Sequence, residues 1–332
     1  MRMKNILITG GAGFIGTNLT KCLLEEGNKV FVVDNLFTGR LSNTIQFRDN
    51  KNYVFLNADI TNKNDYPLIE AFIRKFFENK LDEIYNLACP ASPPKYQIDP
   101  LYTIDVNLAV RDLAELALKY DAKFMHSSTS EVYGDPDDKH HPQSEDYRGN
   151  VNPIGPRACY DEGKRIAETI LYEYFNKRGL KLKLIRIFNT YGPWMDPDDG
   201  RVVSNFICQA LRGEDLTVYG DGTQTRSFQY IDDLIEGMLA MMETEDEFMG
   251  PVNIGSEEEF DMLTLAAEIL IKIPDTKSKS VQKDLPIDDP LQRKADTTRL
   301  REKTGWKPKV DLFTGLDKTI EYFKTIVPKQ SY

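Results

Sequence analysis

An α/β fold with a doubly wound parallel sheet is the architecture that this sequence predicts, and three observations predict it. Short apolar, β-branched runs recur along the first half of the chain, beginning with residues 4–9. Helical patterns of ten or more residues separate these runs. A glycine-rich turn follows the first run directly. Strands that alternate with helices indicate right-handed βαβ units, and such units form a parallel sheet.

Length, composition and charge limit the classes of partner. A chain of 332 residues with 41% hydrophobic and 28% charged residues is typical of a globular protein of about two domains. The formal net charge of −10 argues against nucleic acid and anionic membrane surfaces, which both require a basic face. Since the first strand begins near residue 4 and every apolar run is shorter than a membrane span, we expect no membrane partner.

The cysteines and histidines indicate a compartment and argue against a metal. Four scattered cysteines without a C-x-x-C pair fit reduced thiols, so we expect a cytoplasmic location. Two of the three histidines are neighbours in a polar loop, which is not a metal-ligand spacing. We therefore expect no metal site.

The first strand and the turn after it indicate a dinucleotide site of the Rossmann type. Gly10, Gly13 and Gly16 permit a tight turn, a close approach of the backbone to a pyrophosphate, and close helix–strand packing. The amide groups at the start of the next helix favour phosphate. Asp34 ends the second strand, where a carboxylate accepts hydrogen bonds from the ribose hydroxyls and repels a 2′-phosphate. This pattern favours NAD over NADP, with a solvated turn residue as the alternative for Asp34.

Tyr160 and Lys164 are spaced to share one helix face, at the start of an apolar-periodic run. A nearby cation favours the phenolate, so we expect Lys164 to lower the pKa of Tyr160 and make it a general base. The hydroxyl-rich stretch 127–130 follows the fifth strand, at the sheet edge where open α/β sheets place active sites. The alternative for the Tyr160–Lys164 stretch is an ordinary amphipathic helix, and the alternative for 127–130 is a polar loop.

Beyond the sixth strand the βαβ pattern loosens, which predicts a smaller C-terminal α/β substrate domain. We expect a first domain over 1–188 and a second over 189–332, with about 228–254 returning to the first. Residues 102–119 predict one long helix, and residues 227–230 predict one short strand. Candidate anion ligands in this half are Arg201, Arg226 and Arg293.

These landmarks resemble the extended short-chain dehydrogenase/reductase superfamily, with its glycine motif and its Thr, Tyr and Lys triad. Several longer blocks resemble, within it, the UDP-glucuronic acid decarboxylases (UDP-xylose synthases). The resemblance runs from about residue 3 to 324, and its blocks are residues 88–94, 129–136, 152–164, 199–206, 219–228 and 288–290.

The resemblance implies an NAD-dependent decarboxylation of UDP-glucuronic acid to UDP-xylose through a UDP-4-keto intermediate, with NAD regenerated in each cycle. It also implies a homodimer, formed by a four-helix bundle of the helices that begin near Tyr102 and Tyr160. The residues implied for catalysis are Thr129, Ser130, Glu131, Tyr160, Lys164 and Arg293. Those implied for NAD are Gly10, Gly13, Phe14, Ile15, Gly16, Asp34, Asn35, Thr38, Gly39, Asp59, Ile60, Leu87, Ala88, Asn107, Tyr160 and Lys164. Those implied for the substrate are Pro90, Ser92, Tyr96, Asn189, Arg201, Val203, Thr217, Tyr219, Arg226 and Arg293.

Rival activities share this pattern. A UDP-glucuronic acid 4-epimerase, or another nucleotide-sugar epimerase or dehydratase, uses the same first step. A non-catalytic NAD-binding scaffold is disfavoured because Thr129, Tyr160 and Lys164 are all present. The chain departs from the family pattern at Trp194 and Ala295, and also between Asp105 and Val110. We expect Arg293 to hold the substrate carboxylate, and Glu131 or ring distortion to offset an ion pair that would oppose decarboxylation.

Overall fold

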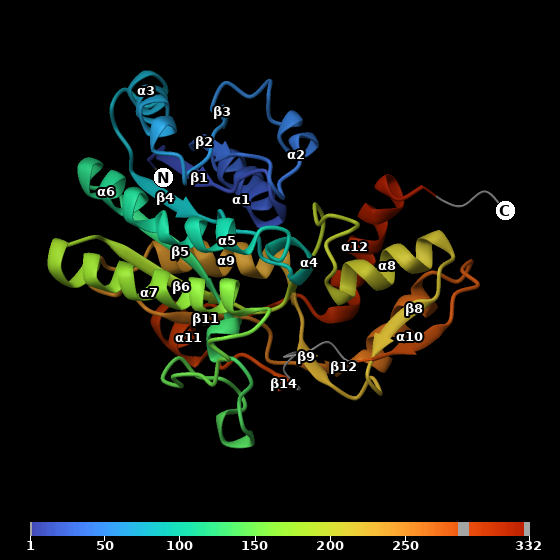
Figure 1. The fold of residues 1–332 in the computed structure, drawn as a ribbon. Coiled ribbons are helices and arrows are strands. Elements are labelled where there is room, and N and C mark those ends of the chain that lie inside the picture. The colour runs from blue at the N-terminus through green and yellow to red at the C-terminus, as the bar shows by residue number, and fades with distance from the viewer. Residues whose placement is uncertain (1, 285–291, 329–332) are drawn as a thin grey trace.

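A computed structural model describes residues 2–284 and 292–328. Its centre is a sheet of seven parallel strands in the order β11-β6-β5-β4-β1-β2-β3 (Figure 1). The strand order reverses beside β1, which opens a crevice at the carboxyl ends of β1 and β4. The strands are β1 (Asn5–Thr9), β2 (Lys29–Asp34), β3 (Tyr53–Asn57), β4 (Glu83–Asn86), β5 (Lys123–Thr129), β6 (Leu182–Ile187) and β11 (Val252–Ile254).

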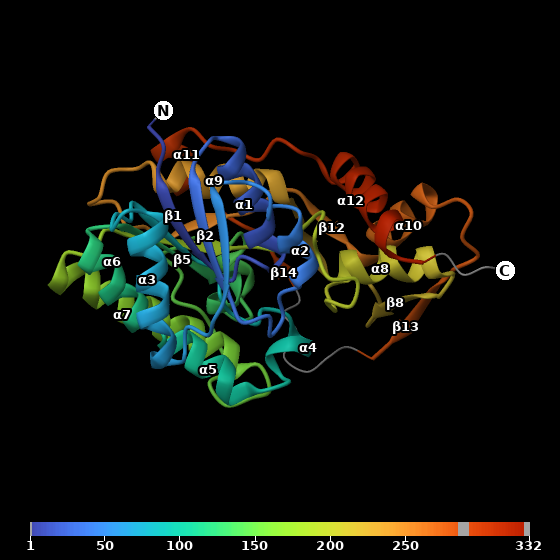
Figure 2. The ribbon, with the colours of Figure 1, turned by 90° about the horizontal axis from the view of Figure 1, so that it is seen from above.

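Helices cover both faces of this sheet (Figures 1 and 2). One face carries α1 (Phe14–Glu25), α9 (Ile231–Met242) and α11 (Thr298–Thr304). The other carries α3 (Tyr66–Phe76), α5 (Pro100–Leu108), α6 (Val110–Tyr120) and α7 (Ala158–Arg178). Side chains of β1 alternate between the two cores, since Ile6 and Ile8 face α1 and α9 whereas Leu7 faces the helices opposite.

A smaller group of elements lies beside the sheet, at the right of Figure 1. Its helices are α8 (Val202–Arg212), α10 (Met262–Lys272) and α12 (Leu312–Ile326). Its strands form three small sheets from β7 (Thr190–Tyr191), β8 (Leu216–Tyr219), β9 (Thr225–Ser227), β10 (Gln229–Tyr230), β12 (Glu259–Asp261), β13 (Ser280–Lys283) and β14 (Gln292–Arg293). Short helical turns complete the chain: α2 (Leu41–Ile45), α4 (Pro93–Tyr96), η1 (Lys63–Asp65), η2 (Ser130–Tyr133) and η3 (Asp138–His140).

Two expected elements are divided in the structure. The long helix expected over 102–119 is divided at Ala109 into α5 and α6, and both halves pack on α7. The strand expected over 227–230 becomes β9 and β10, which pair in different sheets on either side of the buried Phe228. Among the helices within 2–284 and 292–328, none is long and apolar enough to cross a membrane.

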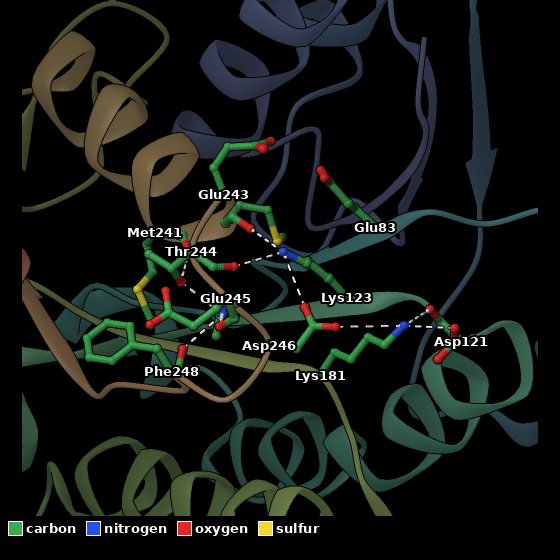
Figure 3. Close-up of polar contacts among 12 residues, drawn as sticks. Glu83, Asp121, Lys123, Lys181, Met241, Glu243, Thr244, Glu245, Asp246 and Phe248 are labelled. Carbon is green, nitrogen blue, oxygen red and sulfur yellow. Dashed lines mark hydrogen bonds and ion pairs between the residues drawn. The ribbon is translucent and has the colours of Figure 1, made fainter. Parts of the chain in front are cut away.

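The loop that leads from α9 to β11 is held at the amino ends of the central strands (Figure 3). Lys183 is fully buried, and its amine donates to Thr244 Oγ1 at 2.8 Å, Glu245 O at 2.6 Å and Phe248 O at 2.9 Å. Lys123 donates to Thr244 O at 2.9 Å. The loop is therefore anchored from below the sheet, at the edge opposite to the crevice.

Candidate active site

A cavity of about 220 Å³ lies at the carboxyl ends of the central strands. The turn after β1, the ends of β2 and β5 and the start of α7 all contribute to its wall. The expected residues that line it are Gly10, Gly13, Phe14, Ile15, Gly16, Asp34, Asn35, Thr38, Gly39, Asp59, Ile60, Leu87, Ala88, Pro90, Ser92, Thr129, Ser130, Glu131, Tyr160, Lys164, Asn189 and Arg201.

The glycine turn brings backbone against backbone. Gly10 has φ +74°, and a Cβ on it would meet the Ala88 nitrogen at 2.6 Å. A Cβ on Gly16 would lie 2.4 Å from the Gly10 oxygen. Gly13 is the N-cap of α1, and no side chain of the described residues caps that helix. The first amide groups of α1 therefore remain available to an anion such as a dinucleotide's pyrophosphate.

Asp34 closes the next side of the cavity. Its carboxylate accepts hydrogen bonds from Leu36 N at 2.8 Å and from Ala12 N at 2.9 Å. Burial raises the pKa of this carboxyl, and the two amides act in the opposite direction. A carboxylate fixed in this way faces the cavity with lone pairs to spare, as a ribose site requires.

A second acidic group lies next to it. Asp59 accepts from Asn35 Nδ2 at 2.9 Å and from the Tyr102 hydroxyl at 3.0 Å. Tyr102 also lines the cavity but is missing from the expected set, since no local motif marks it.

The start of α7 places Tyr160 and Lys164 below the hydroxyl cluster of β5. Lys164 donates to Ser127 O at 2.8 Å, and its Nζ lies 5.8 Å from the centre of the Tyr160 ring. Tyr96 stacks on Tyr160 with ring centroids 5.0 Å apart and planes inclined by 7°. Because Lys164 is held by a carbonyl and Tyr160 is stacked on Tyr96, both groups are fixed in position.

The prediction that the pKa of Tyr160 is lowered is wrong for the protein without ligands. Burial raises the pKa of the phenol, and the neighbouring Cys89 acts in the same direction. A hydrogen bond with Thr129 lowers it, but by less. The prediction failed because it counted the Lys164 charge and omitted desolvation, which sequence spacing does not reveal.

Glu131 is the centre of a buried cluster of charges. Its carboxylate accepts hydrogen bonds from both terminal nitrogens of Arg293, and the bond from Nη2 measures 3.0 Å. It also accepts a hydrogen bond from Arg157 Nη2 at 2.6 Å. Burial would raise the pKa of Glu131, but Arg293 and Arg157 outweigh it and hold the pKa well below its usual range. Asp161 lies on the other side of Arg157, with Oδ2 3.9 Å from its Nε.

Other expected residues lie off the wall of this cavity: Tyr96, Asn107, Val203, Thr217, Tyr219, Arg226 and Arg293. Asn107 is buried and donates to Thr103 O at 2.9 Å. Arg226 and Arg293 are register partners of the parallel pair β9 and β14. Thr217 accepts from Gln209 at 3.1 Å on β8, which also carries Tyr219. The 288–290 block lies outside the described residues.

Sequence reasoning missed Arg157 and Asp161 as members of this cluster. Their i, i+4 spacing is a usable signal, because it predicts that the two side chains share one helix face. In residues 2–284 and 292–328, no group of three or more His, Cys, Asp or Glu side chains is arranged to hold a metal ion.

Comparison with known proteins agrees with this geometry. The curated relative UDP-glucuronic acid decarboxylase 6 of Arabidopsis thaliana is 49% identical over 323 residues, covering 96% of this chain and 88% of the relative. The structure of UDP-glucose 4-epimerase with UDP-glucose from Thermotoga maritima has a TM-score of 0.85 and 31% identity, covering 98% and 100%.

A second solved structure has a related substrate analogue. A mutant UDP-glucuronic acid 4-epimerase from Bacillus cereus, in complex with UDP-4-deoxy-4-fluoro-glucuronic acid and NAD, has a TM-score of 0.80 and 29% identity, covering 97% and 99%. A profile of the NAD dependent epimerase/dehydratase family matches residues 6–255. With its sheet, its glycine turn and its Tyr160–Lys164 pair in place, the chain belongs to the NAD dependent epimerase/dehydratase family.

Proposed function

We propose that this chain is a UDP-glucuronic acid decarboxylase, which converts UDP-glucuronic acid into UDP-xylose and carbon dioxide through a UDP-4-keto intermediate. The observation that carries the proposal is the buried pairing of Glu131 with Arg293 and Arg157, directly beside Tyr160 and Thr129. This machinery combines a proton-transferring phenol with a cationic site for a carboxylate. Relatives such as the Arabidopsis thaliana decarboxylase support it at 49% identity.

Tyr160 is the proton-transferring group of the proposal. When bound, NAD would supply the hydride acceptor, and later the hydride donor, for C4 of the sugar. Tyr160 takes the proton of the 4-hydroxyl, while Thr129 hydrogen-bonds the same oxygen and Ser130 lines the wall beside it. Since burial opposes the phenolate, Lys164 and the charge of the loaded site must offset desolvation before Tyr160 can act as a base. Thr129 and Tyr160 then stabilise the oxyanion that develops at C4 when the carboxylate leaves.

Glu131 limits how strongly Arg293 can bind the substrate carboxylate. A guanidinium that gripped the substrate carboxylate with both nitrogens would stabilise the ground state and oppose the loss of carbon dioxide. In the structure both terminal nitrogens of Arg293 already bind Glu131. The substrate carboxylate therefore has to share Arg293 with Glu131. The shared ion pair orients the carboxylate but binds it less strongly than an unshared Arg293 would.

The cofactor proposed is NAD, held at its pyrophosphate by the glycine turn and at its adenosine ribose by Asp34. The fit rests on the uncapped start of α1 and on the closeness of Gly10 to Ala88. Residues 1–188, with about 228–254, are proposed as the NAD-binding domain. The rest of 189–332 is proposed to bind the nucleotide sugar, with Arg201 and Asn189 on the cavity wall.

A homodimer through a four-helix bundle of α5 and α7 is part of the proposal. The two helices pack side by side, and both carry exposed apolar side chains, which include Leu101 at 74% and Ile166 at 42% exposure. Light scattering at micromolar concentration should give about twice the chain mass of 38.0 kDa. A mass of one chain would contradict it, and Leu101→Asp with Ile166→Asp should produce that mass if these helices form the interface.

A cytoplasmic location is proposed as well, and it is supported by the free thiols of the four cysteines.

One assay tests the activity directly. The protein is incubated with NAD and UDP-glucuronic acid, and carbon dioxide, UDP-xylose and the 4-epimer of the substrate are measured. Carbon dioxide in equal amount to UDP-xylose is the expected result. Formation of the 4-epimer without carbon dioxide would establish the 4-epimerase instead, which the similarity to the Bacillus cereus structure keeps as the second candidate.

A further inference from the structure

Asp161 is a carboxyl group that the proposed reaction leaves unused, although it sits one residue after Tyr160. It is 7% exposed, and its Oδ1 is buried without a hydrogen-bond partner among the described residues. Its Oδ2 approaches Arg157 Nε only to 3.9 Å, which is beyond hydrogen-bond distance. Burying a carboxylate without hydrogen bonds costs far more free energy than burying the neutral acid. The environment of Asp161 therefore favours the protonated form.

The groups that face Asp161 are mostly charged. They are Glu131 from η2, Arg157 ahead of α7, Arg293 from β14 and Glu162 on α7, with the neutral Tyr96 and Cys159 beside them. Burial and Glu131 raise the pKa of Asp161 to about 7, against the opposite effect of the two arginines. In contrast, Glu131 takes the hydrogen bonds of both arginines and stays ionised. Among the described residues of the buried cluster, two cations face two carboxyl groups. Of these two carboxyl groups, only Asp161 has a pKa near neutral pH.

The charge of the substrate upsets this balance. On the proposed function, on which this inference rests, the carboxylate of UDP-glucuronic acid joins the cluster where Glu131 lines the cavity, next to Arg293. With the described residues of the cluster, three carboxyl groups then face two guanidinium groups. Like charges at close range disfavour ionisation, so one carboxyl group has to take up a proton. We infer that Asp161 takes up one proton when UDP-glucuronic acid binds, and that this proton is the one that the decarboxylation consumes.

The proton balance of the reaction agrees with this role. The C5–C6 bond breaks, carbon dioxide leaves, and the electron pair becomes the C4–C5 enolate of the 4-keto sugar. Rebuilding a C5–H bond needs one proton for each carbon dioxide released. Asp161 lies off the cavity wall, so its proton has to cross the buried cluster, of which Glu131 lines the cavity, to reach C5. Asp161 is left ionised, and the cluster returns to its starting charge. Asp161 is thus a proton store behind the site.

Proton uptake on binding is measurable without turnover. The NAD-loaded Tyr160→Phe protein binds UDP-glucuronic acid but cannot start the redox step, so calorimetry in two buffers of different ionisation enthalpy gives the protons bound per site. At pH 8, where a carboxyl of pKa about 7 is about nine-tenths ionised, we expect close to one proton. At pH 6 the uptake should fall toward zero, since Asp161 is then protonated already. UDP-glucose, which lacks the carboxylate, should cause no uptake.

Matched variants locate the proton. Tyr160→Phe with Asp161→Asn should bind UDP-glucuronic acid without uptake, whereas Tyr160→Phe with Glu173→Gln, an exposed carboxyl farther along α7, should behave as the parent. Asp161→Asn alone should lower kcat for carbon dioxide release at least tenfold with little change in KM. Binding without proton uptake in the parent, or uptake that persists in Asp161→Asn, would overturn the inference. A protein that neither binds UDP-glucuronic acid nor releases carbon dioxide would overturn the proposed function instead.

Discussion

Replacing Glu131 by glutamine should slow decarboxylation and tighten substrate binding at the same time. In the structure Glu131 receives two hydrogen bonds from Arg293 and one from Arg157. A neutral amide at this position could not compete for these guanidinium groups as a carboxylate does, so Arg293 would turn both nitrogens to the substrate carboxylate. Hydrogen bonds between charged groups contribute about 1.5–3 kcal/mol each. Two such bonds strengthen the ground state by about 3 kcal/mol or more, and this stabilisation is lost as carbon dioxide leaves.

The expected result is a fall in kcat of roughly a hundredfold, since about 1.4 kcal/mol corresponds to a factor of ten. KM should fall as well, which is the signature of a stabilised ground state. Carbon dioxide release gives kcat, and the absorbance of bound reduced nicotinamide shows that the first hydride transfer still occurs. Tyr160→Phe is the control, because it should abolish both signals. If Glu131→Gln raised KM and left kcat nearly unchanged, Glu131 would be a binding residue and the competition for Arg293 would be refuted.

The remaining predictions concern the cofactor and stability. Asp34→Ala should weaken NAD binding at least tenfold and NADP binding far less, because only NAD gains from a carboxylate at the ribose; tighter binding of NADP than NAD by the unaltered protein would contradict this reading. Lys183→Met should abolish the rise in unfolding free energy with pH that the buried Lys183 causes. Burial lowers the pKa of Lys183 from 10.5 to about 8, so between pH 8 and about 10 the unfolded chain binds more protons than the folded one. The unfolding free energy of the unaltered protein, measured by urea titration relative to Lys183→Met, should therefore rise across that window, and a flat difference would show that Lys183 keeps its proton.

Much of the site was predictable because its parts carry local signatures. Gly10, Gly13 and Gly16 mark a turn that needs glycine, and Asp34 ends a strand whose apolar run is plain in the sequence. Parallel strands bring their carboxyl ends to one edge, so these residues meet Thr129 once the strand order is known. For such residues, position along the chain nearly determines position in space.

The features that escaped prediction depend on tertiary packing. The pKa of Tyr160 follows burial, and burial depends on Tyr96 stacking from another element. The helix expected over 102–119 is divided at Ala109, and both of its halves pack on α7, which begins only at Ala158. Nothing in the acidic run 243–247 indicates that the backbone around it binds a buried lysine from β6. In each of these cases the deciding interaction joins residues that are far apart in sequence.

The return of the chain to the central sheet limits how such a protein can be recombined. After β10 the chain forms α9, which packs on α1, and then β11, which completes the sheet beside β6. A chimaera joined at residue 188 would therefore combine the first six strands of one parent with the seventh strand and a covering helix of the other. Its mismatch would fall in the shared core, where Ile185 and Ile254 are both buried. Exchange of substrate specificity between relatives is thus better attempted by grafting 189–227, 255–297 and 305–328 together, with the returning segment and α11 kept from the host.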